Sequence, residues 1–123
     1  KPQPKDKLTS AINELESKED SDARWRTYVN QQLAGSYQSV FEQIHMLLML
    51  QAPGFEQVLE WRSMQEEKLR AIAAKDASGL MDRQAIERFI QHFERLTRHC
   101  LLTLPDSADR VFRLDAEHRI HLC

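Results

Sequence analysis

The run Met46-Leu47-Leu48-Met49-Leu50 constrains the fold of this chain more than any other stretch of its sequence. Five consecutive apolar residues, followed by the turn residues Pro53 and Gly54, indicate a β-strand buried on both faces, as in a parallel sheet. A second strand is expected at Arg110 to Leu114 from its β-branched and aromatic content. A strand buried on both faces needs neighbouring strands that this chain does not contain. The sequence therefore resembles part of a larger α/β domain.

Helices are expected to fill most of the remaining chain. Their periodicity predicts a short helix within residues 6–22, a helix capped by Asp22 that ends near Gly35, and a short helix capped by Ser36. Two long helices are expected next, one over 55–74 and one with apolar positions from Ile86 to Leu104 that ends at Pro105. Because strands joined through helices are normally parallel, this order predicts a helix-dominated α/β chain with two short parallel strands.

Length and charge narrow the classes of function. A chain of 123 residues suits one domain, so residues 1–123 are expected to form a single unit. Seventeen Lys and Arg against nineteen Asp and Glu give a net charge of -2, which offers no positive excess for a nucleic-acid backbone. The longest apolar run is far shorter than the roughly 20 residues of a membrane-spanning helix. We therefore expect neither nucleic acid nor membrane as a partner.

The two ends of the chain and its cysteines carry less information. The sequence starts at Lys1 without an initiator Met or an apolar leader, which favours a trimmed or truncated chain. Two cysteines, Cys100 and Cys123, do not make a disulfide framework. A reducing compartment fits them better, and the cytoplasm is the expected location.

The helix over 55–74 carries charge where its apolar stripe should continue, at Arg62, Gln65 and Glu66. One interpretation is a solvated stretch with an Arg62 to Glu66 pair at i,i+4 spacing, which contributes about 0.3–0.5 kcal/mol. The other is a cleft-facing Arg62, with Lys68 nearby, that binds an anionic ligand and is held in place by Glu66.

The following helix carries a basic stripe. Arg88, His92, Arg95 and His99 recur at helical spacing and so share one face. This face is either an ordinary solvated surface or a site for phosphate or carboxylate that strengthens as the histidines take up protons.

The histidines, cysteines and glycines bear on two further kinds of site, a metal site and a phosphate loop. The spacing His118-x-x-His121-x-Cys123, together with His99-Cys100, could supply zinc ligands, although no second CxxC-type pair supports this. Cys100 falls on the apolar face of its helix, where a thiol is usually packed and inert. The three glycines are scattered, so neither GxxxxGK[ST] nor GxGxxG is present. Structural zinc stays a minor alternative.

Several stretches spread over nearly the whole chain share their order and spacing with one protein family. They are Asn13-Glu14-Leu15-Glu16, Trp25-Arg26-x-Tyr28-Val29-Asn30, Leu48-Met49-Leu50-Gln51-Ala52-Pro53, Trp61-Arg62-x-x-Gln65-Glu66-x-Lys68-Leu69, Arg88-Phe89-Ile90-Gln91-His92-Phe93-Glu94-Arg95-Leu96-Thr97-Arg98-His99 and Leu114-Asp115-x-x-His118-Arg119-Ile120. In these stretches the chain resembles the carboxy-terminal portion of bacterial D-glycerate 3-kinase-like P-loop kinases, of the phosphoribulokinase, uridine kinase and pantothenate kinase superfamily. The resemblance implies a partial P-loop fold whose phosphate loop would lie upstream of Lys1.

The resemblance also implies a function. The parent would transfer the γ-phosphoryl of ATP to a small hydroxy acid such as D-glycerate, with Mg²⁺ bridging the phosphates. This chain would supply the lid and the acceptor side, and it would be inactive alone, with no cofactor of its own, because it lacks the phosphate loop.

The same resemblance implies roles for individual residues. Arg62 and Lys68 would be the catalytic groups of a lid that approaches the transferring phosphoryl and helps to exclude water, supported by Gln65 and Glu66. The implied substrate-binding residues are Asn13, Glu14, Asn30, His92 and Arg95. The implied nucleotide-adjacent residues are Asp115, His118 and Arg119.

The alternative function is a non-enzymatic helical module that binds a protein partner through exposed apolar patches. Self-association of the chain would be its simplest sign, because a sheet with missing neighbours must cover its edges and faces.

Overall fold

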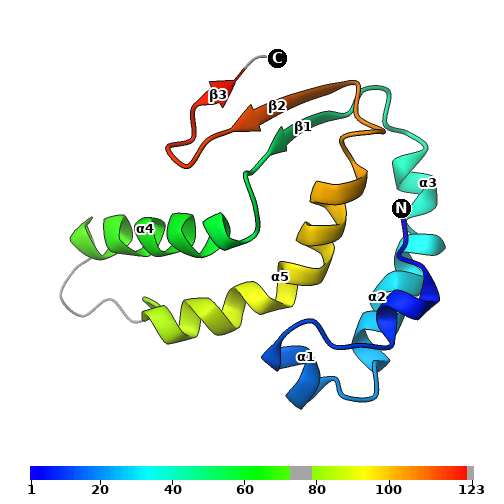
Figure 1. Ribbon diagram of the computed structural model, residues 1–123, viewed down its shortest axis with the longest axis horizontal. Helices are drawn as coiled ribbons and strands as arrows, with labels where there is room; N and C mark the ends of the chain where they lie inside the picture. Colours follow the sequence, from blue (N-terminus) through cyan, green and yellow to red (C-terminus); the bar gives the residue numbers. More distant parts are fainter. Residues whose placement is uncertain (73–78, 122–123) are drawn as a thin grey trace.

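The computed structural model describes residues 1–72 and 79–121. They form a helix-dominated α/β chain in which a small sheet lies across one end of the helices (Figure 1). The elements in chain order are η1 (Lys5–Leu8), α1 (Glu14–Glu19), α2 (Arg24–Ala34), α3 (Gln38–Phe41), β1 (Leu48–Gln51), α4 (Glu56–Ile72), α5 (Arg83–Thr103), β2 (Arg110–Leu114) and β3 (Ile120–His121).

The sheet has three strands in the order β1-β2-β3. β1 and β2 are parallel, as the sequence predicts, and Leu48 lies opposite Arg110 while Leu50 lies opposite Phe112. β3 runs antiparallel to β2 and pairs Ile120 with Leu114. Strand β3 was not predicted, because two residues are too short to show a period-two pattern.

The prediction that the first strand is buried on both faces is wrong for the described part of the chain. Met49 is only 7% exposed, whereas Leu48 and Leu50 are 54% and 64% exposed. Because alternate side chains of a strand point to opposite faces, the helices cover only one face of the sheet. Gln51 lies on the covered face, where its Nε2 donates to the carbonyl oxygen of Leu101 in α5 at 3.5 Å.

The apolar core lies between α4 and α5. Phe55, Ile86 and Ile90 form its buried cluster, and Val58, Leu59 and Met81 pack against it. This core is small for a chain of this length, and it holds α4 against the amino-terminal half of α5 (Figure 1).

Several helix ends differ from the prediction. The N-cap residue of α2 is Ala23, at φ 59°, and not Asp22. The Oδ1 of Asp22 still accepts the backbone N–H of Arg24 at 3.3 Å, while the carboxylate of Asp20 accepts those of Trp25 and Arg26, at 2.7 and 3.1 Å. The N-cap of α3 is Tyr37, without a side-chain cap, so the Ser36 cap is also wrong.

Other helix ends agree with the prediction. Gly35 follows the last residue of α2, and α5 ends before Pro105. The predicted end of the 55–74 helix lies outside the described residues. Across the part of the chain that the structure describes, no helix combines the length and apolar character needed to cross a bilayer.

The core makes a first prediction. We expect Ile86→Ala to lower the free energy of unfolding by about 2–5 kcal/mol, because Ile86 is 2% exposed and its truncation leaves a cavity. Ile72→Ala is the matched control, since Ile72 is 82% exposed and the same truncation there should stay within about 0.5 kcal/mol. Urea unfolding followed by circular dichroism measures both. Equal losses in the two variants would contradict the core described above.

Candidate functional site

Three of the four residues that the resemblance assigns to a lid line one cavity, and Glu66 does not. The cavity has a volume of about 400 Å³ and opens between helix α4 and the loop that joins β2 to β3. Its lining consists of Val58, Trp61, Arg62, Met64, Gln65, Lys68 and His118. We call this space the Arg62 cavity. Two of its residues are cationic, and none of the residues in its lining is a carboxylate.

The loop between β2 and β3 is fixed to α4 through Trp61. The indole Nε1 of Trp61 donates to the carbonyl oxygen of Ala116 at 2.9 Å. The Trp61 ring also stacks on the imidazole of His118, with 4.1 Å between centroids and 28° between planes. His118 adopts φ 62°, which turns the chain back at the tip of the loop. One aromatic residue therefore brings His118 to a helix more than 50 positions earlier in the sequence.

Asp115 closes the same loop. Its Oδ1 accepts the backbone N–H groups of Glu117 and Arg119, at 3.0 and 2.8 Å. Its Oδ2 lies 2.9 Å from Nε2 of His121. The hydrogen bond from His121, and then that from the Arg119 backbone, lower the pKa of Asp115 below its ordinary value. Asp115 and the Arg119 backbone therefore shape the loop, while His118 is the residue that reaches the cavity.

Arg62 is held in a fixed position at the cavity. Its Nη1 donates to Oε1 of Gln65 at 2.8 Å, and its Nη2 lies 2.9 Å from Oε1 of Glu66. Its guanidinium carbon is also 5.7 Å from the centroid of the Phe89 ring. The predicted Arg62 to Glu66 pair is confirmed. The interpretation of this stretch as solvated is wrong for Glu66, which is 4% exposed and also accepts the backbone N–H of Met81 at 3.4 Å.

This arrangement suits an anion. Gln65 and Glu66 orient the Arg62 guanidinium from one side, and the exposed Lys68 adds a second positive charge from the same helix. A guanidinium that is already oriented loses little freedom when it binds a phosphate or carboxylate. The Arg62 cavity can therefore attract and orient an oxyanion.

The residues assigned to the acceptor side do not join this cavity. Asn13 caps α1, because its Oδ1 accepts the backbone N–H of Glu16 at 2.9 Å, and its Nδ2 donates to the Gln91 carbonyl at 3.0 Å. Asn30 makes two hydrogen bonds to the backbone of Gln3, at 2.7 and 3.0 Å. Both side chains attach one segment of the fold to another.

Arg95 is buried in an ion pair. Its Nε and Nη2 donate to the two carboxylate oxygens of Glu16 at 2.7 and 2.6 Å, and both residues are 8% exposed. Its remaining donors reach the carbonyl oxygens of Lys7 and Ser10, at 2.8 and 2.7 Å. Arg95 therefore clamps the amino-terminal segment onto α5.

The rest of the basic stripe also packs against the amino-terminal segment. Arg88 donates to both carboxylate oxygens of Glu19 at 2.8 Å, and Nε2 of His99 lies 2.9 Å from the Lys1 carbonyl oxygen. His92 is exposed, with its Nδ1 3.1 Å from the Phe89 carbonyl oxygen. The stripe is therefore neither a wholly solvated face nor a row of open cations.

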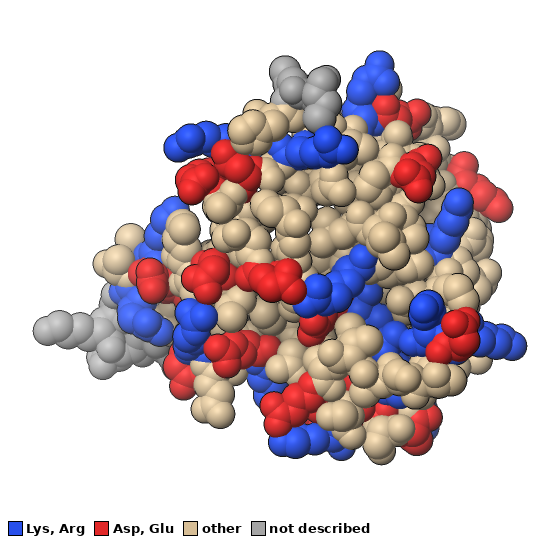
Figure 2. All heavy atoms as spheres, in the orientation of Figure 1, with Lys and Arg blue, Asp and Glu red and all other residues tan. Residues whose placement is uncertain are grey.

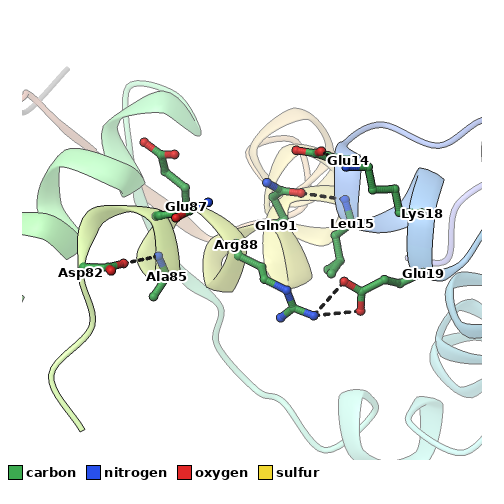
Figure 3. Close-up of a pocket in the computed structure, with 10 residues that line it drawn as sticks. Glu14, Leu15, Lys18, Glu19, Asp82, Ala85, Glu87, Arg88 and Gln91 are labelled. Carbon is green, nitrogen blue, oxygen red and sulfur yellow. Dashed lines mark hydrogen bonds and ion pairs between the residues drawn. The ribbon is translucent and has the colours of Figure 1, made fainter.

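Glu14 lies at an acidic hollow of about 550 Å³ between α1 and α5 (Figure 3). Figure 3 shows Arg88 reaching across to Glu19, and the Gln91 side chain accepting the backbone N–H of Leu15. The hydrogen bond and charge of Lys18 lower the pKa of Glu14. The carboxylates that line the hollow are Glu14, Glu19, Asp82 and Glu87. These carboxylates disfavour the binding of an acidic ligand at Glu14.

The structure thus divides the predicted site residues into separate places. Arg62, Gln65, Lys68 and His118 converge, while the acceptor-side residues lie elsewhere. The sequence motif that contains Arg62 also contains Trp61, to which the sequence alone assigns no role. The one sign of its importance in the sequence is that a large aromatic residue stands beside charged residues on an otherwise polar stretch of helix.

The zinc hypothesis depends partly on Cys123, which lies outside the described residues. Over residues 1–72 and 79–121, no three His, Cys, Asp or Glu side chains lie close enough together to hold a metal ion.

Comparisons of the chain with protein-family models, with curated proteins and with solved structures gave no significant match.

The buried pair predicts a pH dependence. Burial raises the pKa of Glu16, but hydrogen bonds from Arg95 and Ile12 and the nearby positive charges outweigh it and hold the pKa below its ordinary 4.5. A carboxyl whose pKa falls on folding stabilises the fold above its unfolded pKa, and this contribution is lost as the pH falls through the folded pKa. We expect Glu16→Gln to weaken the loss of stability that occurs as the pH falls below the ordinary pKa of 4.5.

Chemical unfolding at a series of pH values measures this effect. Glu67→Gln, at an exposed position of α4, is the control and should retain the pH dependence of the unmodified chain. An unaltered acid dependence in Glu16→Gln would contradict the role given to the Arg95 to Glu16 pair.

Proposed function

We propose that this chain is the lid and acceptor-side part of an ATP-dependent kinase, similar to bacterial D-glycerate 3-kinases, that phosphorylates a small hydroxy acid in the cytoplasm. The observation that carries the proposal is the convergence of Arg62, Gln65, Lys68 and His118 on one cavity. The sequence resemblance assigned the first three to a lid and His118 to the nucleotide side. The Arg62 cavity brings both groups together and lacks a carboxylate in its lining.

The chemistry of the cavity fits the phosphate end of such a reaction. A transferring phosphoryl group carries negative charge on its oxygens, and oriented cations stabilise that charge without covalent chemistry. Arg62, held by Gln65 and Glu66, is the oriented group, and Lys68 is a second donor at the edge. Among the described residues, no cluster of carboxylates lies close enough together to hold Mg²⁺. Metal binding would therefore need residues from elsewhere in the parent.

The open sheet supports the partial character of the proposed domain. Leu48 and Leu50 are more than half exposed on β1, and a strand of this composition is normally covered by neighbouring strands or helices. We therefore propose that the sheet continues in the parent kinase. The acceptor would be bound in part by residues outside this chain, because Asn13, Asn30 and Arg95 have their polar groups occupied by the fold.

The kinase proposal predicts the effect of one substitution. In the complete product of the coding sequence, assayed with ATP and D-glycerate, we expect Arg62→Ala to lower kcat at least about tenfold. Arg83→Ala is the matched control, because Arg83 is exposed, pairs with Glu60 and Glu87, and does not line the Arg62 cavity. Turnover should be nearly unchanged in this control.

Coupled measurement of ADP release gives kcat, and circular dichroism shows whether each variant is folded. A folded Arg62→Ala enzyme with unchanged kcat would remove Arg62 from the mechanism. A complete product with no ATP-dependent transfer to any small hydroxy acid would contradict the proposed function.

A non-enzymatic interaction module is the second candidate, and the exposed apolar surface favours it. Leu48 and Leu50 are exposed on the sheet, and Trp25, Tyr28 and Val40 are more than half exposed on the α2 to α3 segment. Figure 2 shows a broad uncharged area between the scattered acidic and basic side chains on the face that it presents. Such surface is typical of a site that another protein covers.

This candidate predicts self-association of the isolated chain. We expect sedimentation velocity to show dimers or larger species at micromolar concentrations, and Leu50→Lys to shift the population towards monomer because it places a charge on the open sheet face. Ile72→Lys adds the same charge at an exposed position of α4 and should not change the distribution. A monomeric unmodified chain would contradict self-association through the sheet.

A further inference from the structure

A second cavity lies among the amino-terminal segment, α1, α2 and α5, away from the Arg62 cavity. Its volume is about 430 Å³, within the roughly 300–1,000 Å³ of small-molecule sites. It combines an apolar wall with a polar floor. We call it the Trp25 cavity, after the aromatic residue at its edge. It carries an inference that does not depend on the kinase proposal.

The charged side chains that line the Trp25 cavity are all paired. Glu19 at its edge accepts from Arg88, which lies outside the lining, and the other pairs form the floor. Arg95 pairs with Glu16, and Nη1 of Arg26 lies 3.0 Å from Oδ2 of Asp20. All four residues are 7–8% exposed. The Arg26 Nε donates to the Leu8 carbonyl at 2.7 Å, and the donors of Arg95 are likewise taken up by carboxylate and carbonyl oxygens.

The pairing of these charges determines which ligand charge the cavity favours. Each cation in the floor already faces its own carboxylate, so the floor offers no unpaired charge to an ion that enters the cavity. A charged ligand would lose hydration without gaining a counter-ion, and this loss is costly in a partly enclosed site. A neutral ligand avoids it. The cavity therefore suits a different chemistry from the cationic Arg62 cavity.

The residues in the walls of the Trp25 cavity favour a ligand of one shape. Leu15, Val29 and Leu96 line the cavity together with the indole of Trp25, which is 63% exposed and so can be reached from solvent. A flat ring can stack on the indole and cover the aliphatic side chains. At the rim, the His92 tautomer that donates from Nδ1 to the Phe89 carbonyl leaves Nε2 as an acceptor for a ligand N–H or O–H group.

The geometry points to the Trp25 cavity as a binding site for a small, uncharged, planar ligand that carries a hydrogen-bond donor. The ring stacks on Trp25, and the donor faces His92. The two buried ion pairs give the site a rigid and electrically neutral floor.

The two tryptophans of the chain make the test specific, because one lines each cavity. Their indole N–H signals are observed in a ¹H–¹⁵N spectrum and are assigned with Trp25→Phe. Benzamide is the neutral probe, and benzoate and benzylamine are charged probes of nearly the same size. We expect benzamide to shift the Trp25 signal saturably and to leave the Trp61 signal in place. The Kd of either charged probe should be at least about tenfold higher.

A pair of variants tests the charge argument. Val29→Lys places an ammonium group at the wall and should reverse the preference, so that benzoate binds more tightly than benzamide. Gln31→Lys adds the same charge at an exposed position that does not line the cavity, and it should keep the preference for benzamide.

Three results would overturn the inference. They are the absence of a saturable Trp25 shift with benzamide, a benzoate Kd as low as that of benzamide in the unmodified chain, and a shift of Trp25 by D-glycerate with comparable affinity. The last result would instead make this cavity a site for an acid. Kinase activity of the complete product is measured separately, so its loss or presence leaves this test unaffected.

Discussion

The amino-terminal segment, which contains η1 and α1, is held on helix α5 by the buried pair between Arg95 and Glu16. The guanidinium binds the carboxylate through two donors and also holds the carbonyl oxygens of Lys7 and Ser10. In the described chain the buried polar and charged side chains are as numerous as the buried apolar ones, five of each. Apolar burial alone is therefore a weak constraint on this segment. Hydrogen bonds with fixed directions must set how the segment lies on α5.

Much of the framework could be predicted because it depends on local patterns. The long helices follow from their apolar period, the parallel pairing of β1 and β2 follows from the helices between them, and the Arg62 to Glu66 pair follows from i,i+4 spacing. The burial of Glu66 does not follow from spacing. It depends on Met81 from the next segment, whose backbone N–H lies against the carboxylate.

The predictions for Asp22 and Arg95 fail because contacts outside the local pattern override a local preference. Asp22 accepts the N–H group of Arg24, but the carboxylate of Asp20 already faces Arg26 and takes the next two N–H groups of the helix. Arg95 belongs to a basic stripe by spacing, yet its partner Glu16 is 79 positions away. A helical wheel shows which residues share a face and cannot show what packs on that face.

The two cavities show how the same kinds of residues produce different electrostatic surroundings. An arginine that lines each cavity is paired with a glutamate. In the Trp25 cavity, buried carboxylates and carbonyl oxygens take up the guanidinium groups, and the charge available to a ligand cancels. In the Arg62 cavity, Glu66 and Gln65 hold the guanidinium from one side. Lys68 and His118 also line this cavity, and no carboxylate does. The position of the carboxylate relative to the cavity, rather than the presence of arginine, determines which site attracts an anion.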